Sequence, residues 1–126
     1  MADFIQTMNS FWNSFGVPAY NEGSVPDEQR SVYPRITYDV VIPSDAIYES
    51  AMSASIWDRD ASWATAVSIM KQISDVIGKG GIVLPFDDGG MWIKKADPFS
   101  QTMGEDSDDA IRRIYLNISV ELISNS

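Results

Sequence analysis

Apolar and polar side chains follow each other along this chain with two distinct periods, and the first of these periods is helical. Between residues 4 and 15 the apolar positions recur every three or four residues, which predicts an amphipathic helix with a single apolar stripe. Asp3 precedes this stripe and is suited to cap the first turn, while Gly16 and Pro18 end the helix. We therefore expect a helix that packs through one face.

The same period returns over residues 63–77, where Asp60 or Ser62 precedes the first turn and Gly78 follows the last. The apolar stripe of this segment consists of Trp63, Ala66, Val67, Met70, Ile73 and Ile77. These features predict a second helix that has one buried face and a side-chain cap at its N-terminus.

A period of two, which is typical of half-buried strands, marks the other regular segments. The predicted strands are 35–42, 46–57, 82–86, 91–95 and 113–122. The first two are expected to form a hairpin around 43–45, and the next two a hairpin around Asp87-Asp88-Gly89-Gly90, because Asp-Gly between apolar runs favours such turns. In the last strand one face is entirely aliphatic: Ile114, Leu116, Ile118, Val120 and Leu122.

Two segments carry no periodic pattern. Residues 18–34 form a polar run interrupted by proline and glycine, which predicts a long loop, and residues 97–110 are expected to form an acidic loop. The order of elements predicts an α+β fold, an α/β sandwich with one mostly antiparallel sheet and two helices packed on one of its faces. The length of 126 residues fits a single domain spanning 1–126.

Composition narrows the chemistry that this fold is able to perform. The chain has neither histidine nor cysteine, which excludes disulfides, thiol catalysis, thiolate metal sites and histidine-based triads. Nine Lys+Arg against 18 Asp+Glu give a formal net charge of −9, and the isoelectric point is near 4.2. Such an acidic chain is not expected to bind nucleic acid, because phosphate binding requires concentrated basic residues.

Three clusters resemble known sites in composition only. Residues 104–109 offer carboxylates but lack the glycine at the sixth position of a calcium loop, and the glycine-rich turn 78–81 ends a helix instead of opening one, unlike a phosphate loop. Glu49 and Glu121 are the acids of the predicted strands, and nothing in their spacing brings two carboxylates together in a cleft. We expect no catalytic residue, no cofactor and no bound metal, and an enzymatic function is only weakly supported.

The aromatic residues divide into two groups by position. Trp12 and Trp63 lie on helix stripes and are expected in the core. Trp57, Trp92 and Tyr115 have adaptable polar neighbours, and Tyr115 projects from the polar face of the last strand. Aromatic side chains in such surroundings are typical of interfaces, so the outer face of the sheet is a candidate interaction surface.

Several short segments, taken in order, resemble small tail-completion proteins of long-tailed bacteriophages and prophages, and most of all the tail terminator group. The segments are 11–20 (FWNSFGVPAY), 33–38 (YPRITY), 62–63 (SW), 90–93 (GMWI), 98–103 (PFSQTM) and 113–118 (RIYLNI). They span nearly the whole chain, and their order and spacing carry the resemblance.

The resemblance implies a structural virion protein without catalytic residues. Proteins of this group form rings, usually hexameric, that cap the finished tail tube, end its polymerisation and offer a docking surface to the head. The implied contact segments are 18–34, 87–90 and 97–110. With the outer sheet face, they single out the following interface residues: Tyr20, Arg30, Asp87, Asp88, Trp92, Glu105, Asp106, Asp108, Asp109 and Tyr115.

The implied partners are other copies of the chain, the tail tube protein and a head–tail connector protein. The implied location is the head-proximal end of the virion tail, after assembly in the host cytoplasm; residues 1–6 lack the basic leader of a signal peptide, and no apolar run is long enough to span a membrane. An acidic channel would let DNA pass without specific binding. The alternatives are a head–tail connector or stopper, a peptide-binding module that uses a sheet edge, and a small carboxylate-dependent enzyme.

Overall fold

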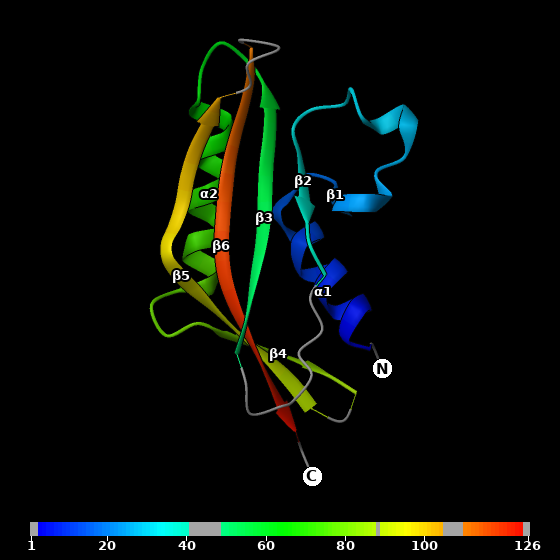
Figure 1. Ribbon diagram of the computed structural model, residues 1–126, viewed down its shortest axis with the longest axis vertical. Coiled ribbons are helices and arrows are strands. Elements are labelled where there is room, and N and C mark those ends of the chain that lie inside the picture. Colours follow the sequence, from blue (N-terminus) through cyan, green and yellow to red (C-terminus); the bar gives the residue numbers. More distant parts are fainter. Residues whose placement is uncertain (1–2, 41–48, 88, 105–109, 125–126) are drawn as a thin grey trace.

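The computed structural model describes residues 3–40, 49–87, 89–104 and 110–124, which form two α-helices and a six-stranded sheet (Figure 1). The helices are α1 (Phe4–Trp12) and α2 (Ala64–Ile77). The strands are β1 (Ala19–Asn21), β2 (Arg35–Tyr38), β3 (Glu49–Arg59), β4 (Ile82–Phe86), β5 (Gly89–Gly104) and β6 (Ile111–Ser124). Among the described residues, no helix is long and apolar enough to cross a membrane.

The strands lie in the order β1-β2-β3-β6-β5-β4, so the strand formed last in the sequence lies inside the sheet. Figure 1 shows β6 along the long axis of the molecule, with β3 on one side and β5 on the other. Four of the neighbouring pairs are antiparallel, whereas β1 and β2 are parallel. The α+β class is confirmed, but the sheet is a mixed one because β1 pairs in parallel.

The core confirms the aliphatic face predicted for the last strand. Ile114, Leu116, Ile118 and Val120 of β6 are at most 1% exposed. Both helices contribute to the same cluster of buried residues, α1 through Met8, Phe11 and Trp12, and α2 through Ala66, Ile69, Ile73 and Ile77. Each large aliphatic side chain buried in this way stabilises the fold by about 1.5–3 kcal/mol, so β6 is a main contributor to the core.

Helix α1 begins as predicted and ends slightly earlier. The Asp3 carboxylate accepts a hydrogen bond from the Gln6 amide nitrogen at 2.8 Å, and the Gln6 side chain accepts one from the Asp3 nitrogen, which completes a capping box. After Trp12 the chain continues as a 3₁₀ turn over Asn13–Phe15 and reverses at Gly16, whose φ of +82° few other residues adopt readily.

Helix α2 lacks the side-chain cap that the sequence predicts. Its N-cap position is Trp63, which makes no capping hydrogen bond. The hydroxyl of Ser62 accepts from the Ala64 nitrogen and the Asp60 carboxylate accepts from the Ser62 nitrogen, so these two residues form the turn that leads into the helix. The buried stripe is also rotated relative to the prediction, because it includes Ile69 and leaves Trp63, Val67 and Met70 only partly buried.

The segment 18–34 is not a plain loop. It contains β1 and two short 3₁₀ turns, Glu22–Ser24 and Asp27–Gln29. The Asn13 side chain holds β1 in place, because it accepts from the Ala19 nitrogen at 3.0 Å and donates to the Ala19 carbonyl oxygen at 3.2 Å. A strand of three residues is too short to produce a period-two pattern, which is why the sequence did not indicate it.

The antiparallel pairing of β2 with β3 is confirmed, and β3 extends to Arg59. The expected turn at 43–45 and the nearby ends of these two predicted strands lie outside the described residues. The pairing of β4 with β5 is confirmed as well, but the predicted loop 97–110 is wrong for its first half, because β5 runs on to Gly104.

A shift of register between Lys95 and Ser100 explains why the period-two pattern of the sequence does not predict the full length of β5. Pairing with β6 is interrupted there and resumes after Pro98, where the Asn117 side-chain amide donates to the Pro98 carbonyl oxygen at 3.0 Å. An irregularity of this kind reverses the phase of the inward and outward residues, so a long strand with one inside it looks aperiodic in the sequence.

Candidate interaction surface

The outer face of the sheet is formed by the strand residues that alternate with the buried ones. In Figure 1, α2 lies behind β5 and β6, and contacts between α2 and β3, β5 and β6 place the core on that side. Side chains on the opposite side belong to every second residue of the strands. This outer face carries polar and aromatic side chains together with the exposed Val83, Met103 and Ile123, and it holds two clusters of interacting side chains.

The first cluster, which we call the arginine ladder, alternates aromatic rings and guanidinium groups: Tyr33, Arg35, Trp57, Arg113 and Tyr115. The guanidinium carbon of Arg35 lies 4.7 Å from the Tyr33 ring centroid and 5.8 Å from that of Trp57. That of Arg113 lies 4.5 Å from the Trp57 centroid and 5.5 Å from the Tyr115 centroid. Both cations therefore lie against Trp57 at cation–π distance.

The register of the strands builds this ladder. Arg35 of β2 is paired with Trp57 of β3, and Trp57 is paired with Arg113 of β6, so the three side chains form a row across the sheet. Tyr115 lies two residues further along the same face of β6. Strand β6 comes much later in the chain than β2 and β3, so only the tertiary fold produces the row.

Hydrogen bonds hold the ladder in position. The indole nitrogen of Trp57 donates to the Thr37 hydroxyl at 2.8 Å, and Nε of Arg113 donates to the Ser55 hydroxyl at 3.0 Å. Arg35 donates through Nη1 to the carbonyl oxygens of Arg30 at 2.8 Å and Val32 at 3.2 Å. Arg35 thus fastens the segment that precedes β2, whereas the hydrogen bond of Arg113 to another described residue uses its Nε.

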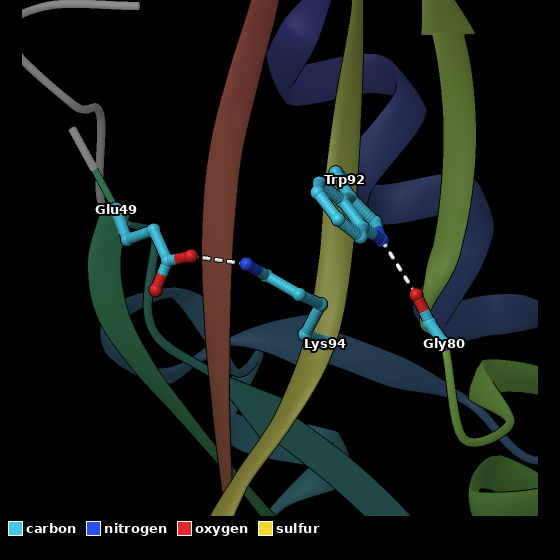
Figure 2. A network of polar contacts seen from close by, with 4 residues as sticks. All are labelled: Glu49, Gly80, Trp92 and Lys94. Carbon is cyan, nitrogen blue, oxygen red and sulfur yellow. Dashed lines mark hydrogen bonds and ion pairs between the residues drawn. The ribbon is translucent and has the colours of Figure 1, made fainter. Parts of the chain in front are cut away.

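The second cluster lies toward the other end of the same face and is drawn in Figure 2. The Lys94 ammonium forms an ion pair with Glu49 and lies 4.2 Å from the Trp92 ring centroid. The Trp92 indole nitrogen donates to the Gly80 carbonyl oxygen at 2.8 Å. Trp92 is therefore held between a lysine on its own strand and the turn that follows α2.

Glu49 and Glu121 lie side by side in the sheet, a pairing that their spacing did not indicate, although neither lines the two hollows described below. They are direct partners in the pairing of β3 with β6, and Trp92 of β5 is the next residue in that row. Directly paired residues have Cβ atoms about 4.5–5.5 Å apart. No pattern in the sequence indicates this pairing, because it depends on the register between β3 and β6, and the two residues are 72 positions apart in the chain.

The structure places the predicted interface residues in different regions. Trp92 and Tyr115 lie on the outer face, while Tyr20 is half-buried in the edge strand β1. Arg30 is exposed and forms an ion pair with Asp27 at 3.4 Å, and Asp87 follows β4 at the opposite edge of the sheet. The other predicted residues, Asp88, Glu105, Asp106, Asp108 and Asp109, lie outside the described residues.

Sequence reasoning missed the basic members of this surface. Arg35, Arg113 and Lys94 were not singled out, although each occupies a polar position in a predicted strand. The available signal was the period-two alternation, which places Arg35 and Arg113 away from the aliphatic face. The pairing of both arginines with Trp57 needed the strand order.

Two open hollows adjoin these elements. One, of about 180 Å³, lies on the outer face beside Tyr115, between Ser53 and Asn117. The other, of about 400 Å³, lies between Val17 and the first two turns of α2. In residues 3–40, 49–87, 89–104 and 110–124, no group of three or more acidic side chains is arranged to hold a metal ion. Both hollows are largely open to solvent.

Comparison with known proteins places the fold. No model of a protein family matches the sequence, and no curated protein matches it. Among solved structures, the chain is similar to one described as the virion of a native gene transfer agent particle, with a TM-score of 0.56 and 16% sequence identity. The match covers 98% of this chain and 87% of that one. The likeness therefore extends over nearly the entire chain and shows a shared fold.

Proposed function

We propose that this protein is a structural component of a virion, and that it acts as a tail terminator: a ring that caps the tail tube and receives the head. The observation that carries the proposal is the fold shared with a virion chain of a gene transfer agent particle over 98% of this chain. The ordered sequence segments that resemble tail terminators point independently to the same class.

The surface is compatible with a role in assembly. Aromatic and arginine side chains are enriched at protein interfaces, and the outer face carries both in a row that hydrogen bonds hold in place. In a ring each subunit joins one surface to a different surface of its neighbour, and the contact closes by rotation. We propose the head-proximal end of the tail as its location, with the tube protein and a head–tail connector as partners, and no catalytic role.

The test is to measure the assembly of the purified protein and its effect on tube growth. Native mass spectrometry and electron microscopy are applied to the protein alone and together with the tail tube protein of the same virion. We expect a ring, hexameric in the family that the chain resembles, located at one end of each tube. Tubes assembled without the protein serve as the control and should continue to grow.

Two outcomes would change this conclusion. A protein that stays monomeric both alone and with the tube protein would contradict the ring. A ring that binds the connector but leaves tube growth unchanged would favour the alternative of a head–tail connector or stopper.

A further inference from the structure

Arg113 is a half-buried cation that lacks a counter-ion in the described part of the chain. It forms no ion pair with any described carboxylate, and its hydrogen bond to Ser55 uses Nε alone. Its guanidinium carbon lies 4.5 Å from the centroid of the Trp57 ring and 5.5 Å from that of the Tyr115 ring. Contact with these rings and the bond to Ser55 limit the movement of the side chain, and neither Nη group donates to a described residue, so their N–H donors are available to a further acceptor.

Arg35 places a second positive charge near Arg113, so a bound anion would interact favourably with two cations. Arg35 lies against the same Trp57 ring, so two positive charges share one aromatic side chain. Arg35 donates through Nη1 to the carbonyl oxygens of Arg30 and Val32, whereas neither Nη group of Arg113 donates to a residue in the described part of the chain. An anion bound by Arg113 would also reduce the repulsion between the two guanidinium groups.

We propose that Arg113 binds a carboxylate of a neighbouring copy of this chain, so that the arginine ladder forms one side of the contact between subunits. This inference rests on the ring proposed above. A guanidinium group offers two parallel N–H donors that match the two oxygens of a carboxylate, and such paired bonds are among the stronger polar contacts in proteins. Arg35 and Trp57 act as positioning residues for Arg113.

The charge of the chain favours a second copy as the occupant. Each copy carries a net charge of −9, so identical subunits repel one another unless a cation lies where they meet. Aspartate and glutamate outnumber lysine and arginine by two to one, and exposed members lie in different parts of the fold: Glu22, Glu28, Asp75 and Asp97. A head-to-tail ring contact joins different surfaces, which allows the ladder of one copy to meet an acidic region of the next.

The first experiment compares the assembly of the wild type with Arg113→Ala, Arg113→Lys and Lys71→Ala. Lys71 is exposed on α2, and its replacement changes the net charge by the same amount as Arg113→Ala. Mass photometry over a concentration series measures the midpoint of assembly. We expect Arg113→Ala to raise this midpoint about tenfold or more and Arg113→Lys to have an intermediate effect, because lysine keeps the charge but loses the paired donors.

A second measurement identifies the partner group directly. Rings of Arg113→Lys assembled from isotope-labelled and unlabelled copies are treated with a zero-length carbodiimide, which joins the introduced amine to an adjacent carboxylate. Peptide mass spectrometry should find links from position 113 to an Asp or Glu of a different copy. This measurement also covers the case in which Arg113→Ala does not fold, as circular dichroism would show.

The outcomes separate this inference from the proposed function. Rings of Arg113→Ala that assemble like the wild type, or equal weakening by Lys71→Ala, would overturn the role of Arg113 and leave the ring intact. Links found only within single copies would do the same. Binding of labelled DNA that is lost in Arg113→Ala, with assembly unchanged, would assign the ladder to phosphate. A wild type that never assembles would overturn the ring and this inference together.

Discussion

Tyr38 shows how one residue joins the first helix to the sheet. Its hydroxyl donates to the Asn9 side-chain oxygen at 2.7 Å, and its ring is stacked on Trp12 with centroids 6.0 Å apart. The side chain is buried, and because burial disfavours the charged phenolate, the pKa of Tyr38 is raised above its ordinary value of 10.0. The proton is thus held more tightly in the folded protein than in the unfolded chain.

Tyr38 allows a prediction about how the free energy of unfolding depends on pH. Tyr38→Phe should lower the free energy of unfolding by about 0.5–1.5 kcal/mol near neutral pH, because the hydrogen bond to Asn9 is lost. The raised pKa stabilises the wild type fully below about pH 10, and this contribution is lost as the pH rises further, since the unfolded chain releases the proton first. Urea titrations should therefore show the two proteins converging above that pH. Parallel pH profiles would contradict the prediction.

At the scale of elements, the turn between α2 and β4 is determined by its approach to β5. Gly81 has a φ of +83°, and a Cβ atom added there would lie 2.5 Å from the Trp92 indole nitrogen and 2.6 Å from the Ile93 carbonyl oxygen. The neighbouring Gly80 has no atom within 4 Å of such a position. The glycine-rich turn therefore serves packing against β5, in agreement with its interpretation as a structural turn.

These two glycines form a matched pair for mutation. Gly81→Ala should lower the free energy of unfolding by about 2 kcal/mol or more, because the new methyl group meets backbone as well as side chain and the backbone is in the left-handed region. Gly80→Ala should change it by less than about 0.5 kcal/mol, as expected of a surface substitution. Thermal unfolding measured by circular dichroism tests both. Equal effects of the two substitutions would show that the close approach to Trp92 is unimportant.

At the scale of the whole molecule, the excess of acidic residues dominates the electrostatic field. The arginine ladder is a local exception, and two arginines are few against a net charge of −9. Stable DNA binding requires several basic side chains that release counter-ions from the phosphates. This balance does not favour stable binding of DNA.

The corresponding prediction concerns the assembled protein. At about 150 mM salt, fluorescence anisotropy with labelled duplex DNA should show no binding at micromolar protein concentrations, because phosphates are repelled by the net charge. A basic DNA-binding domain of similar size provides the positive control. Micromolar affinity that falls steeply with added salt would contradict both this prediction and the idea of unbound passage.

The amino-acid sequence by itself determined the parts of the fold that depend on neighbours in the chain. Four local features were predicted, because each arises from residues a few positions apart: the N-terminal cap by Asp3, the left-handed Gly16, the aliphatic face of β6 and the β4–β5 hairpin. The exclusion of disulfides, thiol catalysis and histidine-based triads likewise follows from composition alone, because the chain has neither histidine nor cysteine.

Only the tertiary structure decided the features that depend on strand register and order. Four features depend on pairing between residues that are not close neighbours in the chain. They are the parallel β1, the length of β5 past its register shift, the pairing of Glu49 with Glu121 and the arginine ladder. A period of two tells which face a side chain occupies but not which strand lies beside it, and a shift of one residue would exchange the faces. The outer face was therefore predictable as a candidate surface, but its rows of neighbouring side chains depend on the position of β6 between β3 and β5.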